Sequence, residues 1–277
     1  MDEQQALEAA ASALGVTDVV AMTRGGQKVV YRATRGSELV ILKIVRILGA
    51  RDPNALERCH REVELLRSLQ SPHIVRVASA IEILGPAPDA AAWLEEALDG
   101  DDLVEIFGDP WGWSEVETFM SQVATGLDVM HSNGYIHRDL SAGNVRRTAA
   151  GTWKIMDPGF AKHLNRSSIT GPWQPGTPGY MSPEHVTLGG RILAASDVFC
   201  LGILAFRALT GALPFDASDP MDYRRRLLSA DSPSVSLGRP DLSGPQAAIV
   251  DGCLERQPAR RFLDAGELLD ALAELKG

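Results

Sequence analysis

The sequence predicts an α+β protein of two lobes, in which a small β-rich lobe precedes a larger α-helical one. Short runs of β-branched and apolar residues prevail before about Leu98, which is typical of strands. Amphipathic and wholly apolar helical patterns prevail after about Gly100. A length of 277 residues suits one large domain or two closely joined lobes. We therefore expect a helical extension over residues 1–16, a first lobe over 17–98 and a second lobe over 99–277.

Composition and charge exclude several classes of protein. Hydrophobic residues at 45% and charged residues at 23% are typical of a globular protein with a real core. The net charge of −9 has the wrong sign for binding nucleic-acid phosphates, so we expect no nucleic-acid partner. Three scattered cysteines predict neither disulfides nor a zinc site. The longest apolar run, 198–206, is too short to span a membrane, and the acidic start lacks a signal-peptide pattern, so we expect a cytoplasmic protein.

The elements of the first lobe follow from residue spacing and turn residues. Apolar residues recur on one face over 2–14 and Gly15 follows them, which predicts a leading helix. The runs 29–31 and 39–42, separated by the turn-forming residues 35–37, predict a hairpin. The remaining predicted elements of this lobe are a helix over 54–69 and strands over 73–80 and 93–97.

The second lobe begins with a strongly amphipathic helix over 114–131, whose apolar residues recur at a spacing of about 3.6. Ser114 and Glu117 predict a capping box at its start. The nearly all-apolar segment 196–210, ended by Gly211, predicts a helix that is buried on every side. The other predicted elements are a strand over 153–156 and helices over 246–256 and 264–276.

A loop after the amphipathic helix carries residues suited to catalysis. His137-Arg138-Asp139-Leu140, with Asn144 further on, matches the pattern H-R-D-L-x-x-x-N at every specified position. An aspartate on a loop can accept the proton of an incoming hydroxyl, and an asparagine beyond it can offer its carbonyl oxygen to magnesium. Asp157, after the strand 153–156, supplies a second hard oxygen ligand. The loop and Asp157 therefore predict a proton acceptor beside two oxygen ligands for a hard cation.

These motifs resemble the eukaryotic-type (Hanks-type) serine/threonine protein kinase family over nearly the whole chain, from about Thr17 to Leu275. The resemblance implies the bilobal protein-kinase-like fold and the use of ATP and Mg²⁺. It also implies that Asp139 is the catalytic base and that Asn144 and Asp157 hold the metal.

Lys43 resembles the family's strand lysine, which neutralises the α and β phosphates of ATP. Glu62 resembles the helix glutamate that pairs with this lysine, and both residues count as catalytic by the resemblance. A flexible ammonium group needs a carboxylate to hold it in one place. Glu57 and Glu64 are alternatives for this role, but the spacing to Pro72 favours Glu62.

The Gly-rich loop of the family is poorly kept. The resemblance implies nucleotide contacts from Gly25, Gly26, Lys28, Val30 and Glu96, in addition to Lys43. Of the three glycines in G-x-G-x-x-G, only the middle one remains at Gly25, because Thr23 and Lys28 take the outer positions. Glycines there let backbone N–H groups approach phosphate, so we expect weaker or rearranged ATP binding.

Three further positions depart from the family pattern. Ser141 stands where serine/threonine kinases carry a lysine that touches the γ-phosphate, and Arg146 or Lys162 are candidates to replace it. Pro158 stands where the family has a phenylalanine. Glu95 stands at the back of the adenine pocket by the alignment, so either the register is off by one or Glu95 has a polar partner.

Residues after the catalytic loop distinguish protein kinases from small-molecule kinases. Glu184, in Ser182-Pro183-Glu184, resembles the end of the activation segment and by resemblance pairs with Arg261. Asp197 resembles the start of the family's buried central helix. We expect these three residues to be structural, and they disfavour the reading of a small-molecule kinase.

The segment before Glu184 carries candidate regulatory residues. Ser167, Ser168 and Thr170 are candidate phosphorylation sites because Arg138 could pair with a phosphate there, and an ordinary polar loop is the alternative. Thr177 is expected to touch Asp139 and to set the position of the substrate.

The resulting prediction is a protein kinase that acts on serine or threonine, an acceptor type inferred mainly from Gly176-Thr177-Pro178. The alternative is a pseudokinase scaffold that binds partners and transfers little phosphate, because the loops that cradle phosphate are eroded. The charge of −9, with Asp99, Asp101 and Asp102, predicts a protein substrate with basic residues near the acceptor. Little chain is left for a sensor, so we also expect a separate regulatory partner, the activation loop or the leading helix to regulate the kinase.

Overall fold

The structure is a computed structural model that describes residues 1–25, 28–47, 55–158, 177–216, 219–229 and 232–275. The chain folds as two compact units. The first comprises Met1–Gln70 and Ile74–Asp99, and the second comprises Ser71–His73 and the described residues from Gly100 onwards.

The first unit is built on a five-stranded antiparallel sheet with strand order β1-β2-β3-β5-β4. Its strands are β1 Thr17–Gly25, β2 Lys28–Arg35, β3 Glu38–Arg46, β4 Glu82–Leu84 and β5 Ala90–Glu96. The predicted hairpin is confirmed as β2 and β3, which are joined by a turn in which Gly36 has a φ of +63°. Such a φ favours glycine, which explains why the turn lies there.

The predicted strand over 73–80 is wrong. That segment forms isolated bridges in place of a strand, one of them from Val77 to Glu95, and the strand that pairs with β5 at this edge is β4. The Ala78 N–H group donates to the Leu94 carbonyl at 2.7 Å, but the Leu94 N–H group donates to the Ser79 hydroxyl at 2.9 Å. A side-chain acceptor has replaced a backbone carbonyl, so the regular ladder does not form there.

Helix α1 (Glu3–Leu14) is an integral part of the first unit. It begins at Asp2, whose carboxylate accepts from the Gln5 N–H group, and ends at Gly15 with a φ of +65°, as the sequence predicts. Its buried residues Ala6, Ala10 and Leu14 pack in one core with the sheet residues Tyr31, Leu84 and Leu94. The helical extension therefore shares the core of the sheet.

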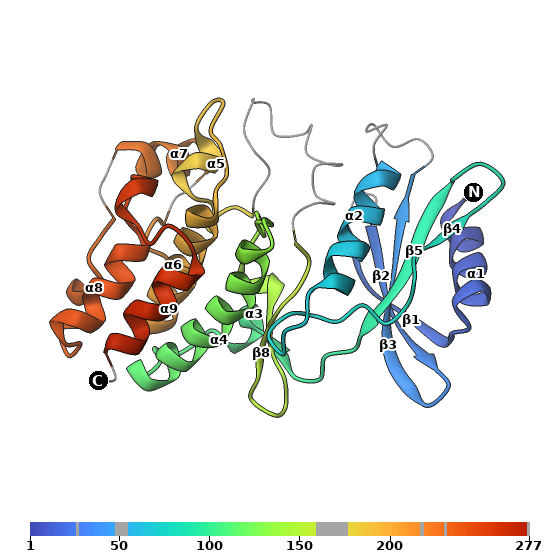
Figure 1. Cartoon of the computed structure of the whole chain (residues 1–277), viewed down its shortest axis with the longest axis horizontal. Coiled ribbons are helices and arrows are strands. Elements are labelled where there is room, and N and C mark those ends of the chain that lie inside the picture. Colours follow the sequence, from blue (N-terminus) through green and yellow to red (C-terminus); the bar gives the residue numbers. More distant parts are fainter. Residues whose placement is uncertain (26–27, 48–54, 159–176, 217–218, 230–231, 276–277) are drawn as a thin grey trace. The chain divides into compact units, whose positions relative to one another are not determined.

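Helix α2 (Ala55–Ser68) confirms the predicted helix and belongs to the same unit (Figure 1).

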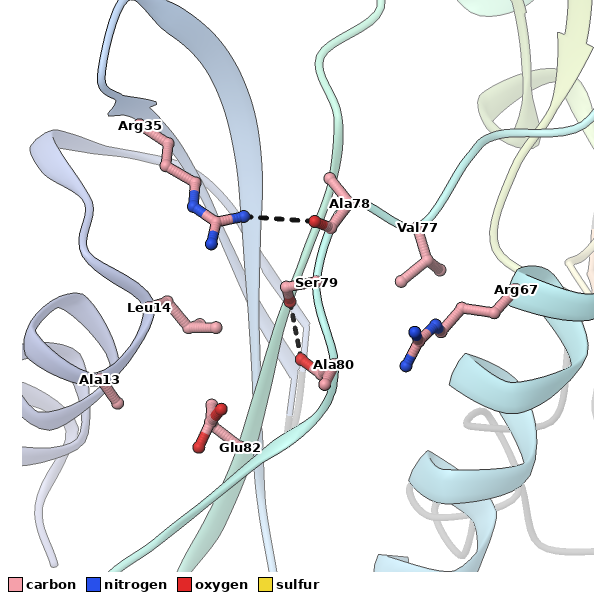
Figure 2. Close-up of a pocket in the computed structure, with 9 residues that line it drawn as sticks. All are labelled: Ala13, Leu14, Arg35, Arg67, Val77, Ala78, Ser79, Ala80 and Glu82. Atoms are coloured by element: carbon pink, nitrogen blue, oxygen red, sulfur yellow. Dashed lines mark hydrogen bonds between the residues drawn. The ribbon is translucent and has the colours of Figure 1, made fainter.

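A cavity of about 400 Å³ is lined by α1, by Arg35 of β2, by Arg67 of α2, by residues 77–80 and by Glu82 (Figure 2). The Arg35 guanidinium donates to the Ala78 carbonyl at 3.3 Å, which ties the end of β2 to that segment.

The second unit is mainly helical (Figure 1). Its α-helices are α3 Leu103–Ile106, α4 Trp113–Ser132, α5 Pro183–Val186, α6 Ala194–Thr210, α7 Pro220–Ser229, α8 Gly244–Cys253 and α9 Ala265–Glu274. Its short strands β6 Asp101–Asp102, β7 Val145–Arg147 and β8 Trp153–Ile155 form one sheet. Among the described residues, none of the helices is both long and apolar enough to cross a membrane.

Helix α6 is the core of this unit. Nearly all of its side chains are buried, and it packs against α4, α8 and α9, which confirms the prediction of a helix buried on every side. It ends at Gly211 with a φ of +75°, also as predicted. Helix α7 has no counterpart among the elements expected from the sequence.

The capping box predicted for α4 is wrong. The helix begins at Trp113 and its N-cap is Gly112, which makes no side-chain cap. The Gly112 carbonyl accepts from the N–H groups of Glu115 and Val116 at 3.1 and 3.2 Å. Ser114 is therefore already helical, whereas an N-cap residue must have a non-helical backbone to reach the free N–H groups.

The contact between α6 and α8 predicts the effect of one substitution. A Cβ atom added at Gly202 would lie 2.6 Å from the Cβ atom of Cys253. We expect Gly202→Ala to lower the free energy of unfolding by about 1–3 kcal/mol, because the two helices must separate. Urea unfolding measures this loss. Gly244→Ala is the matched control, because nothing lies within 4 Å of its added Cβ atom. Equal stability of the two variants would contradict the packing argument.

Candidate active site

The Asp139 carboxylate is oriented from two sides. The Thr177 hydroxyl donates to Asp139 Oδ1 at 2.9 Å, which is the contact that the sequence predicts. The Asn144 amide donates to Asp139 Oδ2 at 2.9 Å and to the Asp139 carbonyl at 2.7 Å. The residue is only 4% exposed. Both carboxylate oxygens therefore have fixed directions, as a base that must meet one particular proton requires.

Arg138 has a left-handed backbone with a φ of +68°, a conformation that costs free energy for any residue other than glycine. Its N–H group donates to Asp197 Oδ1 at 2.9 Å, and its carbonyl accepts from His185 Nε2 at 3.0 Å. His185 Nδ1 accepts from the Ser182 N–H group at 3.2 Å, so the ring proton is on Nε2. Burial lowers the pKa of the His185 imidazole, which keeps the ring neutral in this role. Two side chains thus hold the strained peptide in place.

Asp197, in the first turn of α6, anchors the catalytic loop. The fully buried carboxylate accepts from the N–H groups of His137 and Arg138 at 2.7 and 2.9 Å, and from His131 Nε2 at 3.0 Å. Burial by itself raises the pKa of the Asp197 carboxyl, but the interactions with His131 and His137 outweigh it and hold the pKa below its usual range. The loop is therefore tied to the most buried helix of the unit by a charged acceptor.

His137 links the catalytic loop to the segment that carries Asp157. The buried ring bonds the Met156 carbonyl through Nε2 at 2.9 Å, and the Asp139 N–H group donates to Nδ1 at 3.4 Å. The Met156 N–H group donates to the Asn144 carbonyl at 2.9 Å. Asp157 follows directly, with a left-handed φ of +52°. Two bonds therefore hold Asp157 beside the loop that carries Asn144.

Asn144 and Asp157 fit a hard divalent cation. The Asn144 amide nitrogen is used in bonds to Asp139, which directs its carbonyl oxygen away from that residue. Asp157 is half-buried and offers carboxylate oxygens. Oxygen donors of these two kinds are the ligands that magnesium prefers.

Lys43 lies in the first unit, and the structure answers the question that the sequence raised about Glu95. Glu95 has a polar partner: its Oε2 atom forms an ion pair with Lys43 Nζ, and its Oε1 atom accepts from Trp93 Nε1 at 2.9 Å. The register of β5 on β3 places Trp93 opposite Lys43, so both ends of the contact lie on paired strands. Glu62 is fully buried on α2, and Lys28 Nζ lies 4.0 Å from its Oε1 atom.

The other predicted nucleotide-binding residues lie on three strands of this sheet. Gly25 pairs with Lys28 at the end of the β1–β2 hairpin, and Val30 lies opposite Lys43. Glu96 ends β5, where its carboxylate accepts from the Arg76 N–H group at 2.8 Å. Gly26, Lys162, Ser167, Ser168 and Thr170 lie outside the described residues.

Glu184 and Arg261 form the expected ion pair, with distances of 2.7 and 3.0 Å. Arg261 also donates to the carbonyls of Ala195, Glu255 and Arg256, and Glu184 accepts from Ser196 at 2.8 Å. Burial raises the pKa of the Glu184 carboxyl, but its bonds and charge interaction with Arg261 prevail and lower the pKa below its usual 4.5. The pair joins the end of the activation segment to the base of α6.

The structure also places the residues at which the chain departs from the family pattern. Ser141 and Pro158 are buried, and the Arg146 guanidinium lies 3.9 Å from Asp102, an acid of the same unit.

Sequence reasoning missed His131 and His185. His185 follows Ser182-Pro183-Glu184 directly, so the motif gave its place but not its bond to the catalytic loop.

Comparisons with known proteins agree with this geometry. A profile of the protein kinase domain matches residues 17–270. The chain is 31% identical over 254 residues to the serine/threonine-protein kinase pkn3 of Myxococcus xanthus, covering 86% of this chain and 45% of that protein. It is 28% identical to the probable serine/threonine-protein kinase PknB of Lactococcus lactis, covering 90% of this chain and 40% of that protein. The chain thus spans less than half the length of these two relatives.

Solved structures show the same fold. The kinase domain of Mycobacterium tuberculosis PknI, solved as a point mutant, is 26% identical with a TM-score of 0.69, and the match covers 95% of this chain and 96% of that one. Rad53, solved with AMP-PNP, has a TM-score of 0.73 at 22% identity, covering 92% of this chain and 64% of that one, so it supports the fold alone.

The Glu184–Arg261 pair predicts a large loss of stability when one partner is removed. We expect Arg261→Met to lower the free energy of unfolding by about 3–5 kcal/mol, because the Glu184 carboxylate stays buried without its cation. Urea unfolding measures the loss. The control is the double variant Glu184→Leu with Arg261→Met, which removes both charges and should recover part of it. A double variant less stable than Arg261→Met would contradict this account.

The same pair predicts a dependence on pH. In the wild type the pKa of Glu184 is lowered, so the pair stabilises the fold above pH 4.5 and is lost as pH falls through the lower, folded value. In Arg261→Met both lowering effects of Arg261 are lost and only the bonds from Ser196 and Ser182 oppose burial, so the pKa of Glu184 is higher than in the wild type and the folded variant binds a proton more readily than the folded wild type. The difference in unfolding free energy between wild type and variant should therefore narrow as pH is lowered from about 7 to about 4.5. A constant difference would refute the assignment of the effect to Glu184.

Proposed function

The chain belongs to the protein kinase family and has its α+β fold, and we propose that it transfers the γ-phosphate of ATP to serine or threonine hydroxyls of a protein. The observation that carries the proposal is the Asp139 carboxylate, with one oxygen held by Thr177 and the other by Asn144. An oriented carboxylate beside a threonine of the activation segment suits a hydroxyl acceptor.

The proposed reaction gives each group one role. The acceptor hydroxyl oxygen forms a bond to the γ-phosphorus, the bond from that phosphorus to the β–γ bridging oxygen breaks, and ADP leaves. The hydroxyl proton passes to Asp139, whose carboxylate is directed by Thr177 and Asn144. Asn144 and Asp157 would hold Mg²⁺, which when bound neutralises the charge that develops on the phosphoryl group. Lys43 would neutralise the α and β phosphates.

A cavity of about 310 Å³, lined in part by Pro178 and Gly179 directly after Thr177, supports a proposal about the substrate. Its walls are mainly apolar, with Met181, Leu213 and Phe215 among them, and Asp216 and Asp219 stand at the same cavity. Both aspartates are exposed, and the Asp219 carboxylate caps α7 by accepting from the N–H groups of Met221 and Asp222. We infer a substrate with an apolar residue near the acceptor and a basic residue beside it.

The structure changes the basis of the expectation of basic substrates. Asp102 accepts from the N–H groups of Val104 and Glu105 at 2.9 and 3.2 Å, so its carboxylate caps α3. The N–H groups of the helix start and the nearby Arg146 guanidinium offset the negative charge of the Asp102 carboxylate, so it attracts a basic substrate only weakly. Asp216 is the better candidate for that role.

We also propose in which compartment the protein acts and how it is regulated. Cys59, Cys200 and Cys253 are buried thiols outside any disulfide, which supports a reducing compartment such as the cytoplasm. Phosphorylation of the segment before Thr177, or a separate partner, would regulate the kinase.

Asp139→Asn tests the catalytic assignment. We expect transfer from γ-labelled ATP to a generic basic protein to fall by about 10²–10⁴-fold, because the amide cannot accept the hydroxyl proton. Asp270→Asn, at an exposed acid of the same unit on α9, is the matched control and should transfer normally. The melting temperature of each variant checks that the fold is intact. Undiminished transfer by Asp139→Asn would sink the assignment, and a wild type that binds ATP but transfers no label would favour the pseudokinase alternative.

Asp216→Asn tests the substrate proposal. We expect KM for a peptide with a basic residue beside the acceptor to rise by about two- to fivefold, because a rim charge contributes little. The same variant should treat a peptide with a neutral residue there as the wild type does. Equal changes for both peptides would show that Asp216 does not read substrate charge.

A further inference from the structure

The position of Lys43 is set from the sheet. We infer that Glu95 of β5 is the positioning residue for Lys43, in place of the helix residue Glu62 that the family resemblance implies. This inference rests on the proposed function, in which Lys43 neutralises the phosphates of ATP. It is carried by the direct ion pair between Lys43 and Glu95, whose residues are only 3% and 2% exposed.

The Glu95 carboxylate is itself held in one orientation. Trp93 Nε1 donates to Oε1 at 2.9 Å, and Lys43 Nζ donates to Oε2, so both oxygens have donors. Strand β5 lies between β3 and β4 in the sheet, with Trp93 opposite Lys43. A carboxylate on an interior strand with both oxygens bound cannot follow a helix that moves, so the ammonium group keeps its place independently of α2.

Glu62 belongs to the same group of buried charges but has another cation within reach. Its carboxylate oxygen lies within 4.8 Å of that of Glu95. Two carboxylates this close repel each other strongly in a dry interior, so the group needs two cations. Lys43 bonds Glu95, and Lys28 of β2 lies 4.0 Å from Glu62. The arrangement assigns to Glu62 the task of joining α2 to the sheet through Lys28.

Thermodynamic cycles on unfolding test the pairing without any need for catalysis. The first cycle combines Lys43→Met with Glu95→Gln, and the matched second cycle combines Lys43→Met with Glu62→Gln. We expect the shifts in urea midpoint to be clearly non-additive in the first cycle and closer to additive in the second. Stronger coupling between Lys43 and Glu62 would overturn the inference. Because the readout is unfolding, the result decides the pairing even if the proposed function fails.

Steady-state kinetics test the positioning role. We expect Glu95→Gln to raise KM for ATP by about tenfold to a hundredfold, because the ammonium group loses a charged hydrogen-bond partner. Glu62→Gln should raise KM by less than about threefold, because this variant keeps the ion pair between Lys43 and Glu95. Glu95→Asp keeps the charge and should recover part of the loss. Trp93→Phe removes only the N–H donor and should give a smaller change in the same direction.

The split between kinetic parameters separates positioning from a structural defect. Misfolding would lower the active fraction, and with it kcat, but would leave KM for ATP unchanged. An unchanged KM in Glu95→Gln, with a raised KM in Glu62→Gln, would restore the helix residue to the role and overturn the inference. The ATP-induced rise in melting temperature should fall in the same order as KM rises. A wild type that transfers no phosphate would instead contradict the proposed function.

Discussion

The bond between the Asp197 carboxylate and the backbone of the catalytic loop is the interaction on which the candidate active site depends. Asp197 is fully buried at the start of α6, and it accepts from two consecutive N–H groups of the loop. A buried charge is tolerable only where donors surround it, so the carboxylate and the loop each require the other. This mutual requirement keeps Arg138 in a backbone conformation that it would otherwise leave.

Other buried polar contacts of the second unit also hold its loops in place. His185 holds the carbonyl of the strained residue, and His137 ties the loop to the residue before Asp157. The Glu184–Arg261 pair then fixes the end of the activation segment to the base of α6. Catalytic groups on loops thus gain the precision of a helix core, because buried polar groups must keep their partners.

The first unit uses buried charge in a different way. Lys28, Lys43, Glu62 and Glu95 bring opposite charges together from three strands and one helix. The carboxylate that forms the ion pair with Lys43 comes from β5, which is hydrogen-bonded to β3 along its length. We infer that the residues of a family motif are kept while the pairing among them differs.

The fold class, the order of most elements and the residues of the catalytic loop can all be predicted from the sequence alone. Periodicity and helix stops are local properties, which is why α1, α6 and the β2–β3 hairpin agree with prediction. It failed where a distant group competed with a local pattern, as when the Ser79 hydroxyl took the Leu94 N–H group and ended a predicted strand. Only the tertiary structure decided that Lys43 meets Glu95 and that Asp197 holds Arg138, because those contacts join residues far apart in the chain. Their geometry depends on strand register and on burial, and neither is written in local spacing.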